Sequence, residues 1–343
     1  MWSAWWGGNH ATGLVESVDL TRDPDALDRG GWWAVAVDFE YPAAGHARAW
    51  RFEHVHPRPL PPAADYRGPG TRWDSSLGRD AYLGAVRRIR ELVRAGEVYQ
   101  ANLCRVMSTP APPSQPCQAP GFGPYQLAAR LARGNPAPYA GVLDVPELWL
   151  VSASPELFLR REDDRLWSGP IKGTAPTREQ LLPKDEAENV MITDLVRNDL
   201  HRVCLPGTVA VPALLTVEEH PGLVHLVSTI SGRLRPGATW QQILAALCPP
   251  GSVSGAPKVT ALQAIAQLET ARRGPYCGAL GWVDADRGRA ELAVGIRSFW
   301  VDRADPDPRL RFGTGAGITW GSDPEQEWAE TELKASRLVG LAR

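Results

Sequence analysis

Apolar residues recur at two different spacings along this chain, and the mixture of the two spacings constrains the fold more than any other feature. In residues 79–95 the apolar side chains lie three or four positions apart, which is typical of an amphipathic helix. Similar helices are predicted at residues 184–199, 256–270 and 323–341. Aromatic and β-branched residues instead dominate short segments that are predicted to be strands, namely residues 31–40, 47–53, 98–107, 147–161, 209–216, 223–234, 277–283, 289–301 and 310–319.

The order of these segments predicts the fold class. Strands and helices interleave without a regular strand–helix–strand repeat, so an α+β fold is expected rather than a parallel α/β fold. A Pro- and Gly-rich stretch at residues 56–70 indicates a linker or a surface crossing. We therefore expect a β-rich N-terminal segment over residues 1–76 that packs on a larger unit over residues 77–343. A second Pro-rich stretch, residues 109–123, is expected to be an exposed loop.

Charge and composition exclude several classes of protein. With 37 basic and 39 acidic residues the net charge is -2, whereas a domain that binds nucleic acid usually has a pI above about 9. No apolar run approaches the ~18 residues that span a bilayer, and the N-terminus lacks the features of a signal peptide. The cysteines are odd in number and form no CxxC pair, which favours reduced thiols in the cytoplasm: Cys104, Cys117, Cys204, Cys248 and Cys277.

A lysine followed directly by glycine lies in the segment PIKGT, residues 170–174. The glycine leaves the backbone open to close approach by a ligand. The Lys172 ammonium could pair with an anion or, where it is desolvated, become a neutral nucleophile. Lysine is mostly exposed in proteins, so the motif taken alone is more typical of a solvated loop lysine.

Two pairs of carboxylates are spaced for a metal ion. Asp185 and Glu188 are three positions apart in one predicted helix, and Glu327 and Glu330 are three apart in another. Residues at this spacing share a helix face, and Mg²⁺ commonly takes one or two carboxylates together with water and substrate oxygens. Each pair alone also fits a solvated acidic face. A magnesium site requires that the two pairs converge.

Two glycine-rich segments are candidates for binding an anion. GSVSGAPK, residues 251–258, precedes a predicted helix whose free amides could meet an anion, although it lacks the spacing of a phosphate-binding loop. GTGAG, residues 313–317, is interpreted as a glycine-rich turn whose amides meet a carboxylate.

Eight ordered segments resemble those of the chorismate-utilising enzymes, a family that includes anthranilate synthase component I, aminodeoxychorismate synthase component I, isochorismate synthase and salicylate synthase. The segments are GEVYQANL (96–103), SASPELFL (152–159), PIKGT (170–174), DEAENVMITDLVRND (185–199), HLVSTISG (225–232), GSVSGAPK (251–258), GIRSF (295–299) and GTGAGITWGSDPEQEWAETELKA (313–335). The resemblance implies an α+β fold with two packed β-sheets that are flanked by helices.

The resemblance also implies a set of site residues. Glu188 and Glu330 match the carboxylates that bind Mg²⁺, with Asp185 and Glu327 as their neighbours. Arg297 matches the guanidinium that binds the enolpyruvyl carboxylate of chorismate, a task that suits a two-pronged donor. Further substrate-binding positions are matched by Gly173, Thr174, Ser252, Tyr276, Gly315, Gly317 and Lys334. The expected catalytic positions are matched by Lys172, Glu156, Gln100 and His225.

Two of these positions separate the members of the family. Members that add water carry a lysine base where this chain has Gln100, and an amide cannot take a proton from water. Anthranilate synthases usually carry alanine where this chain has Lys172, whereas the aminodeoxychorismate synthases that it resembles carry lysine. Lys172 is therefore expected to attack ring C2 of chorismate while Glu156 protonates the departing C4 hydroxyl. This role needs a lowered pKa for Lys172 and, through burial, a raised pKa for Glu156.

The expected substrates are chorismate and ammonia. No cysteine lies in a Gly-x-Cys-x-Gly segment of the kind that glutamine amidotransferases use, so a separate glutaminase subunit is expected as the source of ammonia. Two alternatives stay open: an anthranilate synthase component I, and a chorismate-binding subunit without activity that acts as a scaffold for a glutaminase.

Overall fold

The computed structural model describes residues 2–62, 66–70, 72–111, 122–220 and 223–343. Cys117 and most of the expected loop at residues 109–123 lie outside the described residues. The α-helices are α1 (Arg79–Arg94), α2 (Pro124–Gly134), α3 (Pro183–His201), α4 (Trp240–Leu247), α5 (Lys258–Leu268) and α6 (Pro324–Leu341). Short 3-10 turns are η1 (Ala26–Asp28), η2 (Arg178–Gln180) and η3 (Gly251–Val253).

The strands pair only in the antiparallel sense among the described residues, which confirms the α+β prediction. The N-terminal strands are β1 (Ser3–Trp6), β2 (Asn9–Asp19), β3 (Trp32–Val37) and β4 (Ala47–Pro57). The others are β5 (Asp74–Ser75), β6 (Gln100–Pro110), β7 (Tyr139–Asp144), β8 (Leu148–Ser154), β9 (Leu157–Glu162), β10 (Arg165–Gly169), β11 (Ile171–Ala175), β12 (Ala210–His220), β13 (Leu223–Arg233), β14 (Gly255–Ala256), β15 (Ala279–Asp284), β16 (Arg289–Val294), β17 (Ser298–Asp302) and β18 (Arg309–Ile318).

These strands form one continuous hydrogen-bonded network. Its order runs β5–β6–β18–β17–β8–β7–β1–β2–β4–β3–β15–β16–β9–β10–β13, with β12 and β11 both paired to β13 and β14 paired to β6. The two sheets that the resemblance implied are thus the two ends of this network, joined through the N-terminal strands. Strands β1 and β3 pair with β7 and β15 respectively, so residues 1–76 share their sheet with the rest of the chain.

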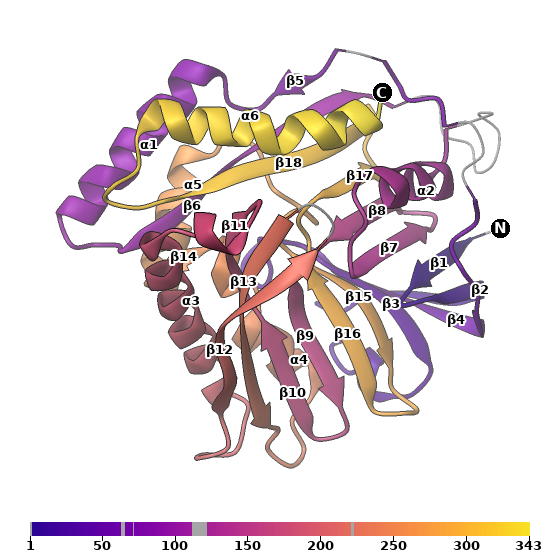
Figure 1. The fold of residues 1–343 in the computed structure, drawn as a ribbon. Helices are drawn as coiled ribbons and strands as arrows, with labels where there is room; N and C mark the ends of the chain where they lie inside the picture. The colour runs from indigo at the N-terminus through magenta and orange to yellow at the C-terminus, as the bar shows by residue number, and fades with distance from the viewer. Residues whose placement is uncertain (1, 63–65, 71, 112–121, 221–222) are drawn as a thin grey trace.

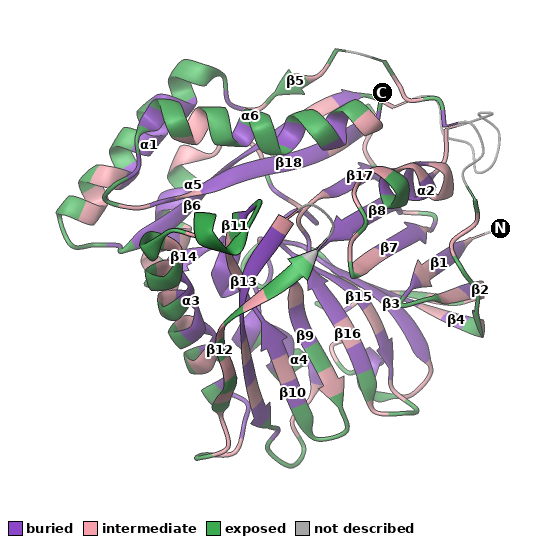
Figure 2. Cartoon of the chain, viewed as in Figure 1, coloured by how far each residue is buried: buried purple, intermediate pink, exposed green. Residues whose placement is uncertain are grey.

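Helices cover the outer faces of this network (Figure 1). Helix α6 runs along β18 and beside α1, α3 lies against β13 and β11, and α2 packs on β7 and β8. Strands β6 and β18 are almost wholly buried, whereas the outer faces of α1 and α6 are exposed (Figure 2). None of the helices within the described ranges is long and apolar enough to cross a membrane.

Two long strands expected from the sequence are each interrupted. The segment at residues 147–161 divides into β8 and β9, because Pro155 lacks an N–H and the chain leaves the ladder there. The segment at residues 289–301 divides into β16 and β17, and Arg297 adopts φ +53° in the gap. Several elements were not predicted, among them α2, α4, β7 and the strand β11, which carries Lys172.

Strand packing predicts a stability effect at Gly281 in β15. A Cβ added there would lie 2.0 Å from the Glu291 carbonyl oxygen of the neighbouring strand, so the backbone would have to move. We expect Gly281→Ala to lower the free energy of unfolding by about 2 kcal/mol or more. The matched control is Gly84→Ala in α1, where nothing lies within 4 Å and alanine should stabilise the helix by about 0.5–1 kcal/mol. Urea unfolding of both variants measures the change. An equal loss of unfolding free energy in the two variants would contradict the expectation.

Candidate active site

The two strand interruptions lie side by side and place Glu156 next to Arg297. Strand β8 pairs with β17 and β9 pairs with β16, so both ladders open at the same level. Backbone hydrogen bonds cross the gap, from Val294 N to Glu156 O at 3.0 Å and from Ala153 N to Arg297 O at 3.1 Å. The arrangement lets two side chains from different strands enter one space instead of alternating between the sheet faces.

Glu156 is held in an environment that favours its protonated form. Its side chain is buried, and burial raises the pKa of Glu156 to about 7 against the opposing effects of the Ser252 hydroxyl and the Lys172 ammonium. Its Oε1 atom has no hydrogen-bond partner among the described residues. A buried carboxyl with one free oxygen and a pKa near neutrality is suited to donating a proton.

Lys172 reaches the same space from β11. Burial lowers the pKa of Lys172, and the carboxylates of Glu188 and Glu156 partly oppose that effect. A Cβ added at Gly317 would lie 3.4 Å from Lys172 Nζ and 2.3 Å from Gln100 Nε2, so both side chains converge on a glycine of β18. Gln100 is buried, and its Oε1 has no partner among the described residues.

The two carboxylate pairs face each other from α3 and α6. Burial raises the pKa of Glu188, and Asp185 and Glu330 add to the effect, which shows that the pairs lie within electrostatic reach. Burial likewise raises the pKa of Glu327, with Glu330 contributing. Asp185 is partly used elsewhere, because its Oδ2 accepts a hydrogen bond from Leu182 N at 2.9 Å and so caps α3.

The four expected metal ligands do not form one cluster. In the described part of the chain, no three His, Cys, Asp or Glu side chains are arranged to hold a metal ion. Mg²⁺ typically uses one or two carboxylates and fills its other positions with water and substrate oxygens. Glu188 and Glu330 could serve as such a pair: they repel each other from the two helices, and Glu330 also pairs with Lys334 at 2.6 Å.

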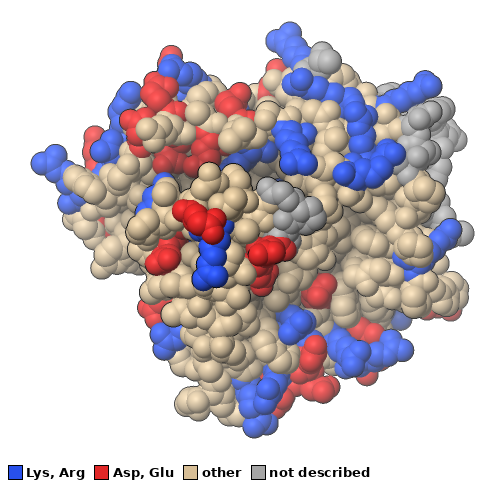
Figure 3. Space-filling model, viewed as in Figure 1, with Lys and Arg blue, Asp and Glu red and all other residues tan. Residues whose placement is uncertain are grey.

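Basic groups lie in the C-terminal half of α6, beyond the carboxylates of its N-terminal half. Acidic side chains gather over the first half of this helix and basic ones over its last half and the neighbouring α2 (Figure 3). Lys334 donates to the Gly315 carbonyl at 3.1 Å. Arg337 lies close enough to Arg297 to join burial in lowering its pKa. The Arg297 guanidinium has no hydrogen bond or ion pair with the described residues, so it is free to bind an anion.

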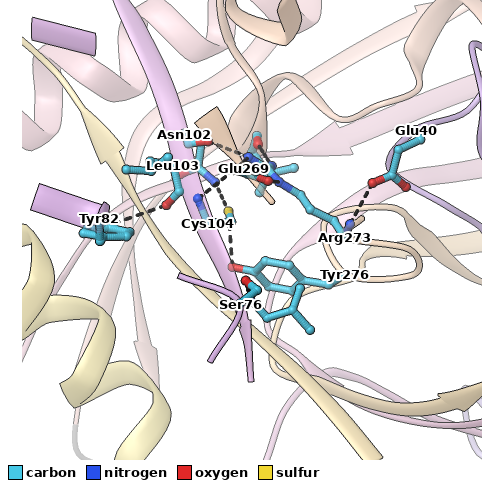
Figure 4. Close-up of polar contacts among 11 residues, drawn as sticks. Glu40, Ser76, Tyr82, Asn102, Leu103, Cys104, Glu269, Arg273 and Tyr276 are labelled. Carbon is cyan, nitrogen blue, oxygen red and sulfur yellow. Dashed lines mark hydrogen bonds and ion pairs between the residues drawn. The ribbon is translucent and has the colours of Figure 1, made fainter. Parts of the chain in front are cut away.

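The structure departs from the expected turn at residues 313–317. This segment is part of β18 and pairs along its length with β6. Its alternate glycines share one face, and the turn was inferred because glycine is usually a turn residue. The Tyr276 ring lies where a Cβ of Gly313 would be, 2.1 Å from Tyr276 Cγ. The Tyr276 hydroxyl is 3.8 Å from the Cys104 thiol in the buried cluster of Figure 4.

The remaining expected residues line the region between β11 and β13. His225 is buried, and its Nδ1 lies 2.8 Å from the Thr174 hydroxyl, which is exposed. Gly173 has φ +88°, and a Cβ there would lie 2.8 Å from the Asp185 Cβ, so glycine allows β11 to approach α3. The binding role expected for each of these residues stays a prediction.

Sequence reasoning missed two groups that the structure brings to the site. Arg337 continues the face of α6 that carries Glu327, Glu330 and Lys334, so extending the same helical spacing by one turn would have found it. Lys184 lies near both Glu188 and Glu327, but a lysine at the start of an acidic helix gives no distinct signal.

Comparison with known proteins shows the family of this chain. The chorismate binding enzyme family model matches residues 30–340. The chain is 39% identical to anthranilate synthase component 1 of Thermus thermophilus, over 96% of this chain and 68% of that protein. It is 34% identical to aminodeoxychorismate synthase component 1 of Salmonella typhimurium, over 90% of this chain and 68% of that protein.

The chain therefore spans about two thirds of the length of these relatives. Its fold is similar to that of MenF, the menaquinone-specific isochorismate synthase from Escherichia coli, with a TM-score of 0.77. That alignment covers 100% of this chain and 89% of MenF at 21% identity, which shows the fold alone. Because the family model matches residues 30–340 of the chain, the chain belongs to the chorismate binding enzyme family.

Proposed function

We propose that this chain is the aminating component of an aminodeoxychorismate synthase, which converts chorismate and ammonia to 4-amino-4-deoxychorismate. The observation that carries the proposal is the placement of the half-buried Lys172 beside the buried Glu156. Burial lowers the pKa of the lysine and raises that of the glutamic acid to about 7. Both shifts favour the neutral amine and the protonated acid that displacement of a ring hydroxyl requires.

In the first step Lys172 Nζ forms a bond to ring C2 of chorismate. Both ring double bonds shift, from C1=C2 to C1=C6 and from C5=C6 to C4=C5, and the C4 hydroxyl leaves as water with the proton that Glu156 donates. In the second step ammonia forms a bond to C4, both double bonds shift back, the bond between Lys172 and C2 breaks, and the added nitrogen loses a proton to Glu156. The burial of Glu156 supports its role as acid in the first step and as base toward the incoming ammonia in the second.

The other charged groups of the site position the substrate. Arg297 is free to bind the enolpyruvyl carboxylate, and Arg337 adds positive charge on the same side. Glu188 and Glu330 would hold Mg²⁺, which when bound offsets the negative charge of the ring carboxylate. Gln100 stands where a base for water would be needed, and its amide cannot act as one.

The ammonia is proposed to come from a separate glutaminase subunit. The relatives carry the name component 1, which supports a partner component. The four cysteines within the described residues are buried and free, so none of them is placed to attack glutamine from solvent. Cys117 lies outside those residues.

Anthranilate synthesis is the second candidate, because the Thermus thermophilus relative carries that name. Both reactions begin with amination of chorismate, and they differ in whether pyruvate then leaves. The test is to incubate the chain with chorismate, Mg²⁺ and ammonium and to identify the product by mass. We expect 4-amino-4-deoxychorismate without pyruvate. Fluorescent anthranilate with an equal amount of pyruvate would replace the proposal, and unchanged chorismate would favour a scaffold without activity.

Variants at Lys172 test its role as nucleophile. We expect Lys172→Ala to lower kcat for chorismate consumption by at least about 100-fold, because the covalent route is lost. Lys172→Arg keeps a positive charge that can bind a carboxylate but has no neutral amine at working pH. It should therefore keep a KM near the wild-type value with the same loss in kcat. Full activity in Lys172→Arg would show that the lysine only binds an anion.

The pKa of Glu156 predicts a dependence on pH. Because the folded-state pKa of about 7 lies above the ordinary 4.5, Glu156 contributes stability that is full below pH 4.5 and is lost as pH rises through 7. Glu156→Gln removes the titration, so its stability relative to wild type should rise by up to about 3 kcal/mol between pH 5 and pH 8. Thermal unfolding at the two pH values measures the difference. A difference that is independent of pH would contradict the raised pKa.

The carboxylates of α3 and α6 predict a requirement for Mg²⁺. We expect Glu188→Gln and Glu330→Gln each to weaken Mg²⁺ binding at least about 10-fold, because each removes one of two charged ligands. Isothermal titration with MgCl₂ measures the affinity directly. Glu325→Gln is the matched control, since Glu325 lies in the first turn of α6, the helix of Glu330, but pairs with Arg79 at 2.6 Å. Equal affinity in all three variants would place the metal elsewhere.

A further inference from the structure

The buried loop that carries Ser252 is held at both ends by charged side chains that the proposed reaction does not use. The loop runs from Pro249 through η3 to Ser254 and has little regular structure of its own. Its residues are buried, and Ser252 provides the hydroxyl that is hydrogen-bonded to Glu156. A small cavity beside Glu156 is lined by this loop and by Asp199 of α3. The position of Ser252 therefore depends on what fixes the loop.

Lys258 fixes the start of the loop. Its ammonium pairs with Asp199 Oδ2 at 2.5 Å, and both side chains are largely buried. The same ammonium donates to the Pro249 carbonyl at 3.0 Å and to the Leu247 carbonyl at 3.4 Å. This lysine ends the segment GSVSGAPK, and the structure gives it backbone carbonyls and a carboxylate as partners.

Arg273 fixes the end of the loop (Figure 4). Its guanidinium is fully buried, donates to the Val253 carbonyl at 2.9 Å and to the Asn102 carbonyl at 2.5 Å, and pairs with Glu269 at 2.6 Å. It also lies over the Phe39 ring, 4.0 Å from its centroid.

Glu269 and Asn102 extend this contact to β6. Glu269 accepts from Cys104 N at 2.8 Å, and Asn102 N donates to the Ser254 carbonyl at 2.8 Å. One arginine thus joins the Ser252 loop to the strand that begins with Gln100.

We propose that Lys258 and Arg273 are positioning residues that hold the Ser252 hydroxyl against the Glu156 carboxyl. A buried ion pair is often replaceable by apolar side chains without loss of stability, so stability alone gives no reason for two of them around one loop. The remaining N–H donors of Lys258 and Arg273 instead bind backbone carbonyl groups, either of that loop or of Leu247 and Asn102 beside it. The proposal rests on the proposed function only in taking Glu156 as the acid.

The groups that face Glu156 define what a variant would change. They are Lys172 from β11, Arg297 from the gap before β17, Ser252 from the loop and, across the small cavity, Asp199 from α3. The Ser252 hydroxyl stabilises the ionised carboxylate. Losing that hydrogen bond should therefore raise the midpoint of the Glu156 titration by about one pH unit.

The experiment compares four variants in the full chain with Mg²⁺ present. Ser252→Ala removes the hydroxyl, and Arg273→Lys keeps the buried charge but loses the forked donors. The double variant Lys258→Met/Asp199→Leu replaces the other ion pair without leaving a lone charge. Arg287→Lys is the matched control, since Arg287 is exposed and pairs with Asp284 at 2.8 Å. The Glu156 titration is followed by the infrared carboxyl band with Glu156→Gln as the reference, and kcat for chorismate consumption is measured against pH.

We expect Ser252→Ala, Arg273→Lys and the double variant to raise the Glu156 midpoint by about one pH unit and to lower kcat about 10-fold with little change in KM. Adding Arg273→Lys to Ser252→Ala should shift the midpoint no further, because both act through the same hydroxyl. Folded variants with an unchanged midpoint, or shifts that add, would overturn the proposal. Arg273→Lys decides the matter if the double variant does not fold. The infrared titration needs no turnover, so it separates this outcome from failure of the proposed function.

Discussion

The site depends on the withdrawal of Glu156 and Lys172 from water: the glutamic acid is buried, and the lysine beside it is half-buried. Burial alone favours the neutral form of each group, whereas their mutual attraction favours the ion pair. The raised pKa of Glu156 and the lowered pKa of Lys172 show that burial outweighs attraction for both groups. Loosening the packing around either group would let water favour the charged forms again. The surrounding fold therefore determines the chemistry as directly as the two side chains do.

The interruption of two neighbouring strands is what brings the acid and the anion-binding arginine together. In an uninterrupted strand, successive side chains would alternate between the two faces of the sheet, and the backbone would stay in regular pairing with the neighbouring strand. The gap between β8 and β9 opens at Pro155, and the gap between β16 and β17 contains Arg297 with a positive φ. A non-glycine residue in that conformation costs energy that the surrounding structure must offset. Packing of the surrounding residues, and not the conformational preference of Arg297 itself, thus holds the chain in this conformation.

The long amphipathic helices could be predicted from the sequence, because their apolar spacing and flanking prolines or acidic caps are local signals. Helix α4 was missed because WQQILAAL has only eight residues, too few to establish a helical period, and β11 was missed because Lys172 and Gly173 are not typical strand residues. The two strand gaps were missed because apolar residues resume directly after each of them. Pro155 and Gly295 are the local signals of the two breaks.

For the site, the motifs predicted which residue types would be used, but not how they meet. The electrostatic contact between the α3 and α6 carboxylates is a tertiary feature, and so is the use of Asp185 to cap α3. The hydrogen bond from Ser252 to Glu156 joins residues almost a hundred positions apart, and only the folded chain reveals it. Arg337 was missed as well, although the residue spacing of its own helix would have found it.

The glycines at alternate positions of β18 explain how so many side chains fit at one wall. Gly313, Gly315 and Gly317 share a face because strand residues alternate. A Cβ at each would meet a different neighbour: the Tyr276 ring at 2.1 Å, the Cys104 thiol at 2.5 Å and the Gln100 amide at 2.3 Å. The first two spaces are therefore filled from the protein interior.

Only the third space also borders Lys172, at 3.4 Å from its Nζ. The three glycines that let β18 pack against the core thus leave a space beside the Lys172 amine at the position of Gly317. A side chain at position 317 would push the Gln100 amide away or close off Lys172, so only glycine leaves room for both groups beside β18.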